Sequence, residues 1–143
     1  MKIGIIGTGN VGCACAMAAV NRGSAREVVL VNRDRKTAEA VATDMRYGTP
    51  LGPKVDIVDG DYDDFKGAGI VLITVGVNEK TGGATDRNDP QGRLKLLDKN
   101  AEIYRDIVPR SRGRSPTRCC SWSPIRPSRS PTSRARPLPG WRC

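Results

Sequence analysis

The sequence predicts an α/β fold, a Rossmann-type doubly wound parallel sheet that is incomplete and is followed by a disordered tail. Short apolar runs alternate with segments of helical periodicity along the first 110 residues. The first run, residues 2–6, is followed directly by a Gly-x-Gly-x-x-Gly pattern and then by an Ala-rich segment. A later run, residues 69–75, is continuously apolar, which is typical of a central parallel strand. Together these features favour βαβ units with right-handed crossovers.

Each glycine of the pattern has its own physical task. Gly7 makes the tight turn out of the strand, Gly9 lets a pyrophosphate approach the backbone, and Gly12 lets the helix pack closely on the strand. The free N–H groups and the dipole at the helix start favour phosphate charge. A Gly-rich turn with no ligand is the alternative, and the strand and helix on either side argue against it.

A second apolar run ends at Asn32, twenty residues after Gly12. A dinucleotide-binding fold places the residue that faces the adenosine ribose at this distance. Asn32 is therefore a candidate ribose ligand, with an ordinary strand-end residue as the alternative.

The other elements follow from periodicity and from turn residues. The expected elements are a helix at about 10–22, strands at about 27–32, 55–58 and 69–75, a helix that begins after Asp34, a short connection at 61–65, a polar loop at about 77–90 and a helix at about 91–108. We expect Phe65 to anchor the connection to the core. The expected apolar face of the last helix comprises Leu94, Leu97, Ala101, Tyr104 and Val108. The strand order 3-2-1-4 then places a ligand between strands 1 and 4, beyond their carboxyl ends.

Charge divides the chain into two compositions. All 15 acidic residues and 16 of the 24 basic residues precede Ser111, whereas residues 111–143 carry eight Arg, no acid and six of the ten Pro. The formal net charge of +9 therefore resides almost wholly in the second part. We expect a dinucleotide-binding domain over residues 1–109 and an Arg/Pro/Ser-rich disordered tail over 110–143.

The sequence also excludes several classes of protein and site. No apolar segment is long enough to span a membrane, and Gly7 and Gly9 interrupt the first apolar run too early for a signal peptide. The chain contains no His, so we expect no zinc site. Cys13 and Cys15 are interpreted as small buried residues, and we expect a cytoplasmic, reduced protein.

Five segments resemble the N-terminal half of the lactate/malate dehydrogenase family. The segments are residues 7–12, Asp44-Met45, residues 60–64, residues 71–76 and Arg93-Leu94 through Asn100. Together they cover about residues 1–108 in the order of the family. The resemblance implies a cytoplasmic NAD-dependent oxidoreductase that acts on 2-hydroxy acids. Such an enzyme is usually a dimer or tetramer and moves a hydride between nicotinamide and a small 2-oxo acid.

The resemblance also implies which residues would bind the cofactor. By their match to the family, the cofactor-binding residues are Gly7, Gly9, Asn10, Val11, Gly12, Asn32, Thr74, Val75, Gly76 and Asn100. Asn32 departs from the Asp that the family usually has, so the negative charge that disfavours a 2′-phosphate is missing. Because Arg33 and Arg35 are close in sequence, NADP stays open beside NAD.

For the substrate, the resemblance points to arginines in and after the polar loop. Arg93 lies seven residues before Asn100 and matches the mobile-loop arginine that polarises the substrate carbonyl. Arg87 lies six residues before Arg93, where malate-type members carry an arginine for the second carboxylate. Asn100 also matches a position near the substrate. The alternative for both arginines is a solvated loop charge, and lactate and malate are not distinguished.

Hydride transfer to a carbonyl also needs a proton donor. The family uses a His steadied by an Asp, both in its second half, and no side chain here has an ordinary pKa near neutrality. We therefore expect the cofactor-binding half of a dehydrogenase that does not turn over substrate by itself. A non-catalytic dinucleotide-binding module is the alternative.

The segment after the last helix lacks apolar periodicity, so we expect the next strand to be absent and the edge of the 70–75 strand to be unpaired. A shifted reading frame would explain this. Residues 117–127, written in G/C-rich codons and read from the third base of the first codon, give Ala-Val-Leu-Leu-Val-Val-Ala-Asp-Pro-Pro. The rival interpretation is an evolved nucleic-acid-binding tail, in which arginines contact phosphates and Trp122 and Trp141 stack on bases.

Overall fold

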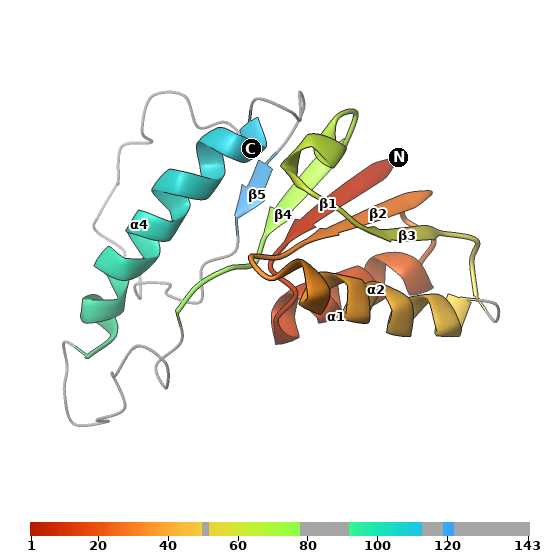
Figure 1. Cartoon of the computed structure of the whole chain (residues 1–143), viewed down its shortest axis with the longest axis horizontal. Coiled ribbons are helices and arrows are strands. Elements are labelled where there is room, and N and C mark those ends of the chain that lie inside the picture. Colours follow the sequence, from red (N-terminus) through yellow and green to blue (C-terminus); the bar gives the residue numbers. More distant parts are fainter. Residues whose placement is uncertain (50–51, 78–91, 113–118, 122–143) are drawn as a thin grey trace, which may run out of the picture.

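The computed structural model describes residues 1–49, 52–77, 92–112 and 119–121. In chain order the elements are β1 (Lys2–Ile6), α1 (Asn10–Asn21), β2 (Glu27–Val31), α2 (Arg35–Gly48), β3 (Asp56–Asp59), a 3-10 helix (Tyr62–Phe65), β4 (Ile70–Ile73), α4 (Gly92–Arg112) and β5 (Cys119–Ser121). Figure 1 shows α1 and α2 together on one side of the strands, with α4 lying apart from them. The predicted alternation of strands and helices is confirmed.

The five strands form one parallel sheet in the order β3-β2-β1-β4-β5. The expected order 3-2-1-4 and the α/β fold class are therefore confirmed. The crossover from β1 to β2 and the later return to β4 place the carboxyl ends of β1 and β4 side by side, with Ile6 opposite Ile73. This is the switch point at which open α/β sheets bind ligands.

The alternation of side chains along the strands builds two cores. Ile5, Val28 and Leu30 pack with Ala16 of α1 and Ala42 of α2 on one face of the sheet. The intervening strand residues, such as Ile6 and Val29, pack on the other face with Phe65, Val71 and Ile107 of α4. Because both faces are covered, the central strands β1, β2 and β4 consist almost entirely of apolar residues, as buried parallel strands do.

Local signals at the helix ends act as the sequence suggests. Asp34 begins α2 as its N-cap and accepts a hydrogen bond from the backbone N–H of Lys36 at 3.2 Å. Phe65 is completely buried, which confirms it as the anchor of the connection. A Cβ on Gly4 would lie 2.6 Å from the Phe65 ring, so this strand position has to be glycine for the ring to reach the sheet.

The predicted apolar face of α4 is confirmed in part: Tyr104 and Val108 are half-buried and pack on the core, whereas Leu97 is 49% exposed and the side chain of Leu94 lies outside the described residues. Among the described side chains of this helix, the buried ones are Leu96, Asn100, Ile107 and Ser111. The helix also continues beyond Val108, through Pro109, to Arg112. Two of the buried residues are polar, and their side chains bond to backbone: Asn100 to Val77, and Ser111 to Val108. Apolar periodicity ignores such residues, so it misses Asn100 and Ser111 and includes the exposed Leu97.

The expectation that the next strand is absent is also wrong. Cys119–Ser121 pairs in parallel with β4, with Val71 opposite Cys119 and Leu72 opposite Cys120. Parallel pairing uses backbone N–H and C=O groups, so a segment without apolar periodicity can complete a ladder if no proline interrupts it. Residues 117–123 lie between Pro116 and Pro124 and contain no proline. Within the described residues, the edge of β4 is therefore paired over Val71–Ile73.

Several predictions fall outside the described residues. The polar loop falls there from residue 78 onward, with Arg87, and so does the tail from residue 122 onward, with Trp122 and Trp141. The domain boundary at residue 109 stays a prediction.

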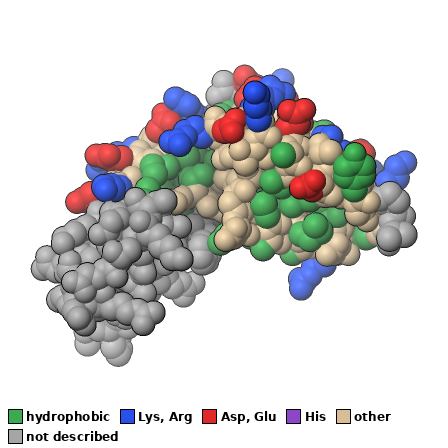
Figure 2. Space-filling view, turned by 60° about the horizontal axis from the view of Figure 1, so that its bottom comes forward, with side chains coloured by type: hydrophobic (Ala, Val, Ile, Leu, Met, Phe, Trp, Pro, Cys, Tyr) green, Lys and Arg blue, Asp and Glu red, His purple; other side chains and the backbone are tan. Residues whose placement is uncertain are grey.

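No helix in the described part of the chain is long and apolar enough to cross a membrane. Figure 2 shows basic and acidic side chains close together along the upper border of the face in view.

Candidate functional site

The Gly-rich turn joins β1 to α1 at the carboxyl edge of the sheet. Gly7 has a φ of +98°, a conformation that side chains rarely adopt. Its backbone N–H donates to the carbonyl of Val31 at 2.8 Å, which ties the turn to β2. A Cβ on Gly7 would lie 2.7 Å from Cγ1 of Val75. The tight turn that the sequence predicts at Gly7 is therefore confirmed.

Gly12 lies where the first turn of α1 packs against this loop. A Cβ there would overlap the carbonyl oxygen of Gly7 and would lie 2.8 Å from the hydroxyl of Thr74. Close contact between helix and strand thus requires glycine at position 12, as the sequence pattern predicts.

Gly9 differs from both because a Cβ built on it meets no atom of the described residues within 4 Å. It is the N-cap of α1, with extended backbone, and its carbonyl accepts the backbone N–H of Cys13 at 2.9 Å. No side chain caps α1, and its first turn holds no acidic residue. The N–H groups that begin the helix, from Asn10 onward, therefore lie beside open space, an arrangement that suits an anion.

Thr8 was not recognised from the sequence. Its side chain is 7% exposed, and within the described residues its Oγ1 is a buried side-chain oxygen without a hydrogen-bond partner. Buried hydroxyls are normally satisfied by protein, water or ligand. The only sequence signal was its place between two glycines of the motif.

Cys13 keeps this end of the helix uncharged. Its thiol donates to the carbonyl of Thr8 at 3.3 Å. Burial raises the pKa of this thiol, and the nearby backbone hydrogen bond offsets part of that rise. A neutral thiol here leaves the helix N-terminus free of negative charge, which favours an anionic ligand.

Thr74 is bound to the turn itself. Its Oγ1 lies 2.8 Å from the carbonyl oxygen of Gly7 and 3.1 Å from that of Ile6, and can donate to either. Its backbone N–H also donates to Ile6 at 2.9 Å. Val75 is half-buried, and Gly76 is exposed just after it. Thr74 therefore connects the end of β4 to the Gly-rich turn.

Asn100 is placed by α4 and is 4% exposed. Its Oδ1 accepts the backbone N–H of Val77 at 2.6 Å, and its Nδ2 donates to the carbonyl of Val77 at 3.4 Å. Both ends of the amide are thus engaged with one residue just beyond β4. The structure brings Asn100 to the carboxyl edge of the sheet and uses its side chain to fix the backbone there.

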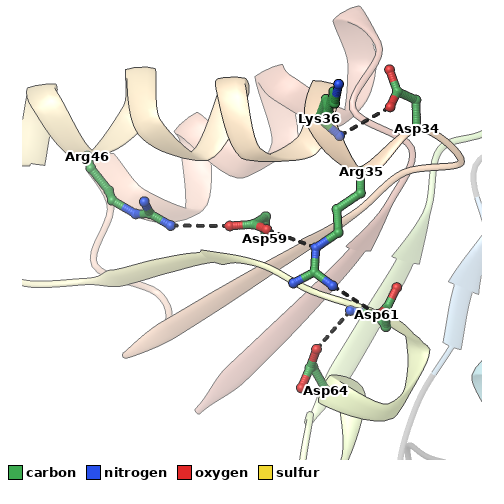
Figure 3. A network of polar contacts seen from close by, with 7 residues as sticks. All are labelled: Asp34, Arg35, Lys36, Arg46, Asp59, Asp61 and Asp64. Atoms are coloured by element: carbon green, nitrogen blue, oxygen red, sulfur yellow. Dashed lines mark hydrogen bonds and ion pairs between the residues drawn. The ribbon is translucent and has the colours of Figure 1, made fainter.

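Asn32 is half-buried at the end of β2 and is followed by a network of ion pairs (Figure 3). Arg35, the first residue of α2, reaches Asp59 at 3.3 Å and Asp61 at 3.2 Å. Asp59 also faces Arg46 at 3.6 Å. Sequence reasoning placed Arg35 near the ribose but missed its partners, which lie 24 and 26 residues away.

On the substrate side of the site, the structure describes the backbone of Arg93. Arg93 is the second residue of α4, at its N-terminal end. No group of three or more His, Cys, Asp or Glu residues in the described part of the chain could hold a metal ion.

Comparisons with known proteins agree on one family. A family model described as lactate/malate dehydrogenase, NAD binding domain, matches residues 1–120. L-lactate dehydrogenases of Chloroherpeton thalassium and of Thermus aquaticus are each 44% identical over 110 residues, or 77% of this chain. That stretch is 33% of each relative, so the chain spans about a third of their length.

Solved structures give the same result. A minor L-lactate dehydrogenase from Enterococcus mundtii, in ligand-bound form, matches 84% of this chain and 36% of its own length. Its TM-score is 0.72 at 33% identity. A lactate dehydrogenase from a Medee basin deep-sea metagenome library matches with a TM-score of 0.69 at 37% identity, over 84% of this chain and 37% of that one.

Proposed function

Because the chain belongs to the lactate/malate dehydrogenase family through its NAD-binding domain, we propose that it binds NAD(H) at the Gly-rich turn. The observation that carries this proposal is the contrast among the three glycines. Gly7 and Gly12 are required by the backbone, whereas the space beside Gly9 is open. A glycine is needed at an open position when something outside the chain approaches it, and a pyrophosphate beside the start of α1 meets that requirement.

The remaining cofactor residues follow the carboxyl edge of the sheet. Asn10 and Val11 would offer backbone N–H groups to the pyrophosphate, and Asn32 would bond a ribose hydroxyl. Val75 and Gly76 would line the groove near the nicotinamide, with Thr74 and Asn100 holding the backbone around them. We infer NAD rather than NADP, because Arg35 is engaged by two carboxylates although Asn32 brings no charge.

For the whole dehydrogenase we propose the reaction of the family. The nicotinamide supplies or accepts a hydride, and the substrate is a small 2-hydroxy or 2-oxo acid. Arg93 would polarise the substrate carbonyl, and Arg87 would contact the substrate as a second cation. The relatives described above are named L-lactate dehydrogenases, so pyruvate is the first substrate to test. A cytoplasmic location and a homo-oligomer stay predictions of the family resemblance.

We further propose that these 143 residues do not turn over substrate unaided. The sequence contains no His, and burial raises the pKa of Cys13 and of Tyr62 further from neutrality. A proton donor is needed as the hydride reaches the carbonyl. The chain would thus bind the cofactor without completing the reaction.

We propose that the tail after α4 comes from a shifted reading frame, because the composition changes at about residue 111 and the alternative frame of residues 117–127 encodes an apolar strand. β5 occupies Cys119–Ser121, within the segment where the alternative frame encodes an apolar strand. Sequencing the coding DNA from the codon of Tyr104 onward tests this. One inserted or deleted base that restores a frame with His supports it, whereas an intact frame points to binding as the whole function, and salt-sensitive RNA binding would then favour the basic tail.

Titration with NADH, followed by nicotinamide fluorescence, tests the proposed function of the chain. We expect saturable binding to the 143-residue protein and no oxidation of NADH when pyruvate or oxaloacetate is added. Absence of NADH binding by the folded chain would contradict the proposal. Steady turnover with either substrate would contradict the inference about the proton donor.

A further inference from the structure

The ion-pair network at the end of β3 lies beside the expected adenosine end of the dinucleotide site. Asp59 ends β3 and is paired in register with Leu30 of β2. The next residue, Gly60, donates its backbone N–H to Leu30 at 3.0 Å. The carboxyl ends of β2 and β3 therefore meet where Asn32 leaves the sheet and α2 begins.

Arg35 lies between these two carboxyl ends. Its Nε reaches Oδ2 of Asp59 and its Nη1 reaches Oδ2 of Asp61 (Figure 3). An arginine near the end of the second strand is the group that accommodates a 2′-phosphate in NADP-binding proteins of this fold. Here both sides of its guanidinium are taken by carboxylates of the same chain.

Charge in the network is balanced. Two arginines, Arg35 and Arg46, face two aspartates, Asp59 and Asp61. A 2′-phosphate added here would meet no surplus positive charge within the network and would lie near two carboxylates. The usual discriminating charge is missing at Asn32, and the network instead brings the carboxylates of Asp59 and Asp61 to Arg35, three residues after Asn32.

We propose that Asp59 and Asp61 set the preference for NAD over NADP by holding Arg35 away from the 2′-phosphate position. This inference rests on the proposed dinucleotide-binding function. Asp59 and Asp61 are specificity-determining residues that act through Arg35, and Asn32 is a neutral ribose contact. Arg35 is the latent 2′-phosphate ligand of the chain.

The exposure of the pairs indicates that the network can be altered at little cost to stability. The side chains of Arg35 and Asp61 are 62% and 70% exposed, whereas that of Asp59 is 18% exposed and is shared with Arg46. Exposed ion pairs contribute little to stability. Removing the charge of Asp61 should therefore free Nη1 of Arg35 without unfolding the chain, while Nε stays paired with Asp59. Asp61 is also the N-cap of the 3-10 helix, and Asn caps helices as well as Asp does.

The experiment compares NADH and NADPH affinities of the full chain and its variants. Asp61→Asn should tighten NADPH binding about fivefold with NADH affinity unchanged, the effect of one exposed ion pair. Asp59→Asn combined with Asp61→Asn should give a larger gain. Adding Arg35→Gln to Asp61→Asn should remove the gain. Asp56→Asn, at the opposite end of β3, changes net charge equally and should leave the ratio unchanged.

Each outcome is decisive. A gain in NADPH affinity that depends on Arg35 supports the proposal. An unchanged NADH-to-NADPH ratio in both Asp variants, or a gain that survives Arg35→Gln, overturns it while leaving NAD binding intact. If the folded wild-type chain binds neither dinucleotide, the proposed function fails and this inference fails with it. Thermal unfolding midpoints of all variants verify that the fold is retained.

Discussion

Three glycines of one motif have three different physical reasons to be glycine. Gly7 is needed for its positive φ, and Gly12 because its Cβ would overlap the Gly7 carbonyl. Gly9 has neither constraint, which leaves the approach of a ligand as its reason. At the scale of single residues, stability and binding can therefore be separated by substitution.

Gly12→Ala should damage the fold far more than Gly9→Ala. The methyl group at position 12 would force the helix away from the turn, and we expect a loss of about 3 kcal/mol or more. At position 9 the lost helix cap and the gain from a stiffer unfolded chain nearly cancel, within about 1 kcal/mol. Urea unfolding followed by circular dichroism measures both. Equal losses would contradict the geometry of the turn.

Thr8→Val tests whether the buried hydroxyl serves the ligand. Without ligand, replacing an unsatisfied hydroxyl by a methyl should leave stability unchanged or raise it by about 1 kcal/mol. NADH affinity should fall, because the only polar atom of this side chain is gone. A clear loss of stability in the unliganded chain would show that Thr8 has a structural partner in solution, and unchanged NADH affinity would exclude a role in binding.

At the scale of elements, α4 shows that buried polar residues are overlooked when a buried helix face is predicted from apolar periodicity. The stripe that faces the sheet includes Asn100 and Ser111, whose side chains satisfy backbone groups. Satisfied polar groups can be buried at little cost, so hydrophobic periodicity alone omits them and identifies only part of the packed face, Tyr104 and Val108. The two hydrogen bonds between the Asn100 side chain and the Val77 backbone hold this helix at the carboxyl edge of the sheet.

Ile107→Ala should cost about 2–4 kcal/mol, the usual loss for a large buried aliphatic side chain. Leu97→Ala, on the exposed face, should change the unfolding free energy by less than about 1 kcal/mol. Both substitutions put Ala into α4, so their helix-propensity terms differ by only a few tenths of a kcal/mol, about the difference between Ile and Leu. If Leu97→Ala cost more than Ile107→Ala, the face that contains Leu97 would be the packed one, as periodicity predicted.

The fold was largely predictable because parallel strands buried on both faces leave continuous apolar runs, as in residues 70–73. The Gly-rich turn was predictable because the backbone of the turn itself requires glycine at positions 7 and 12. The Arg35 network was not, because its partners are brought together only by the pairing of β2 with β3. Thr8 and β5 were missed because an unsatisfied hydroxyl and a backbone ladder carry no side-chain pattern.

At the scale of the whole molecule, β5 completes the sheet of the described chain. A chain cut after Arg112 would lose β5 and leave the β4 edge unpaired, and we expect it to self-associate. A chain cut after Ser123 keeps β5 and serves as the control. Sedimentation velocity at several concentrations distinguishes them. Identical behaviour of the two chains would mean that β5 does not protect this edge.

The central claim is that the open space at Gly9 receives the pyrophosphate of NAD(H). The most direct measurement is the NADH dissociation constant of Gly9→Ala against Gly48→Ala, since both positions leave a Cβ with nothing within 4 Å. We predict that Gly9→Ala weakens NADH binding by about tenfold or more while Gly48→Ala binds like the wild type. Equal affinities of the two variants for NADH would contradict the account.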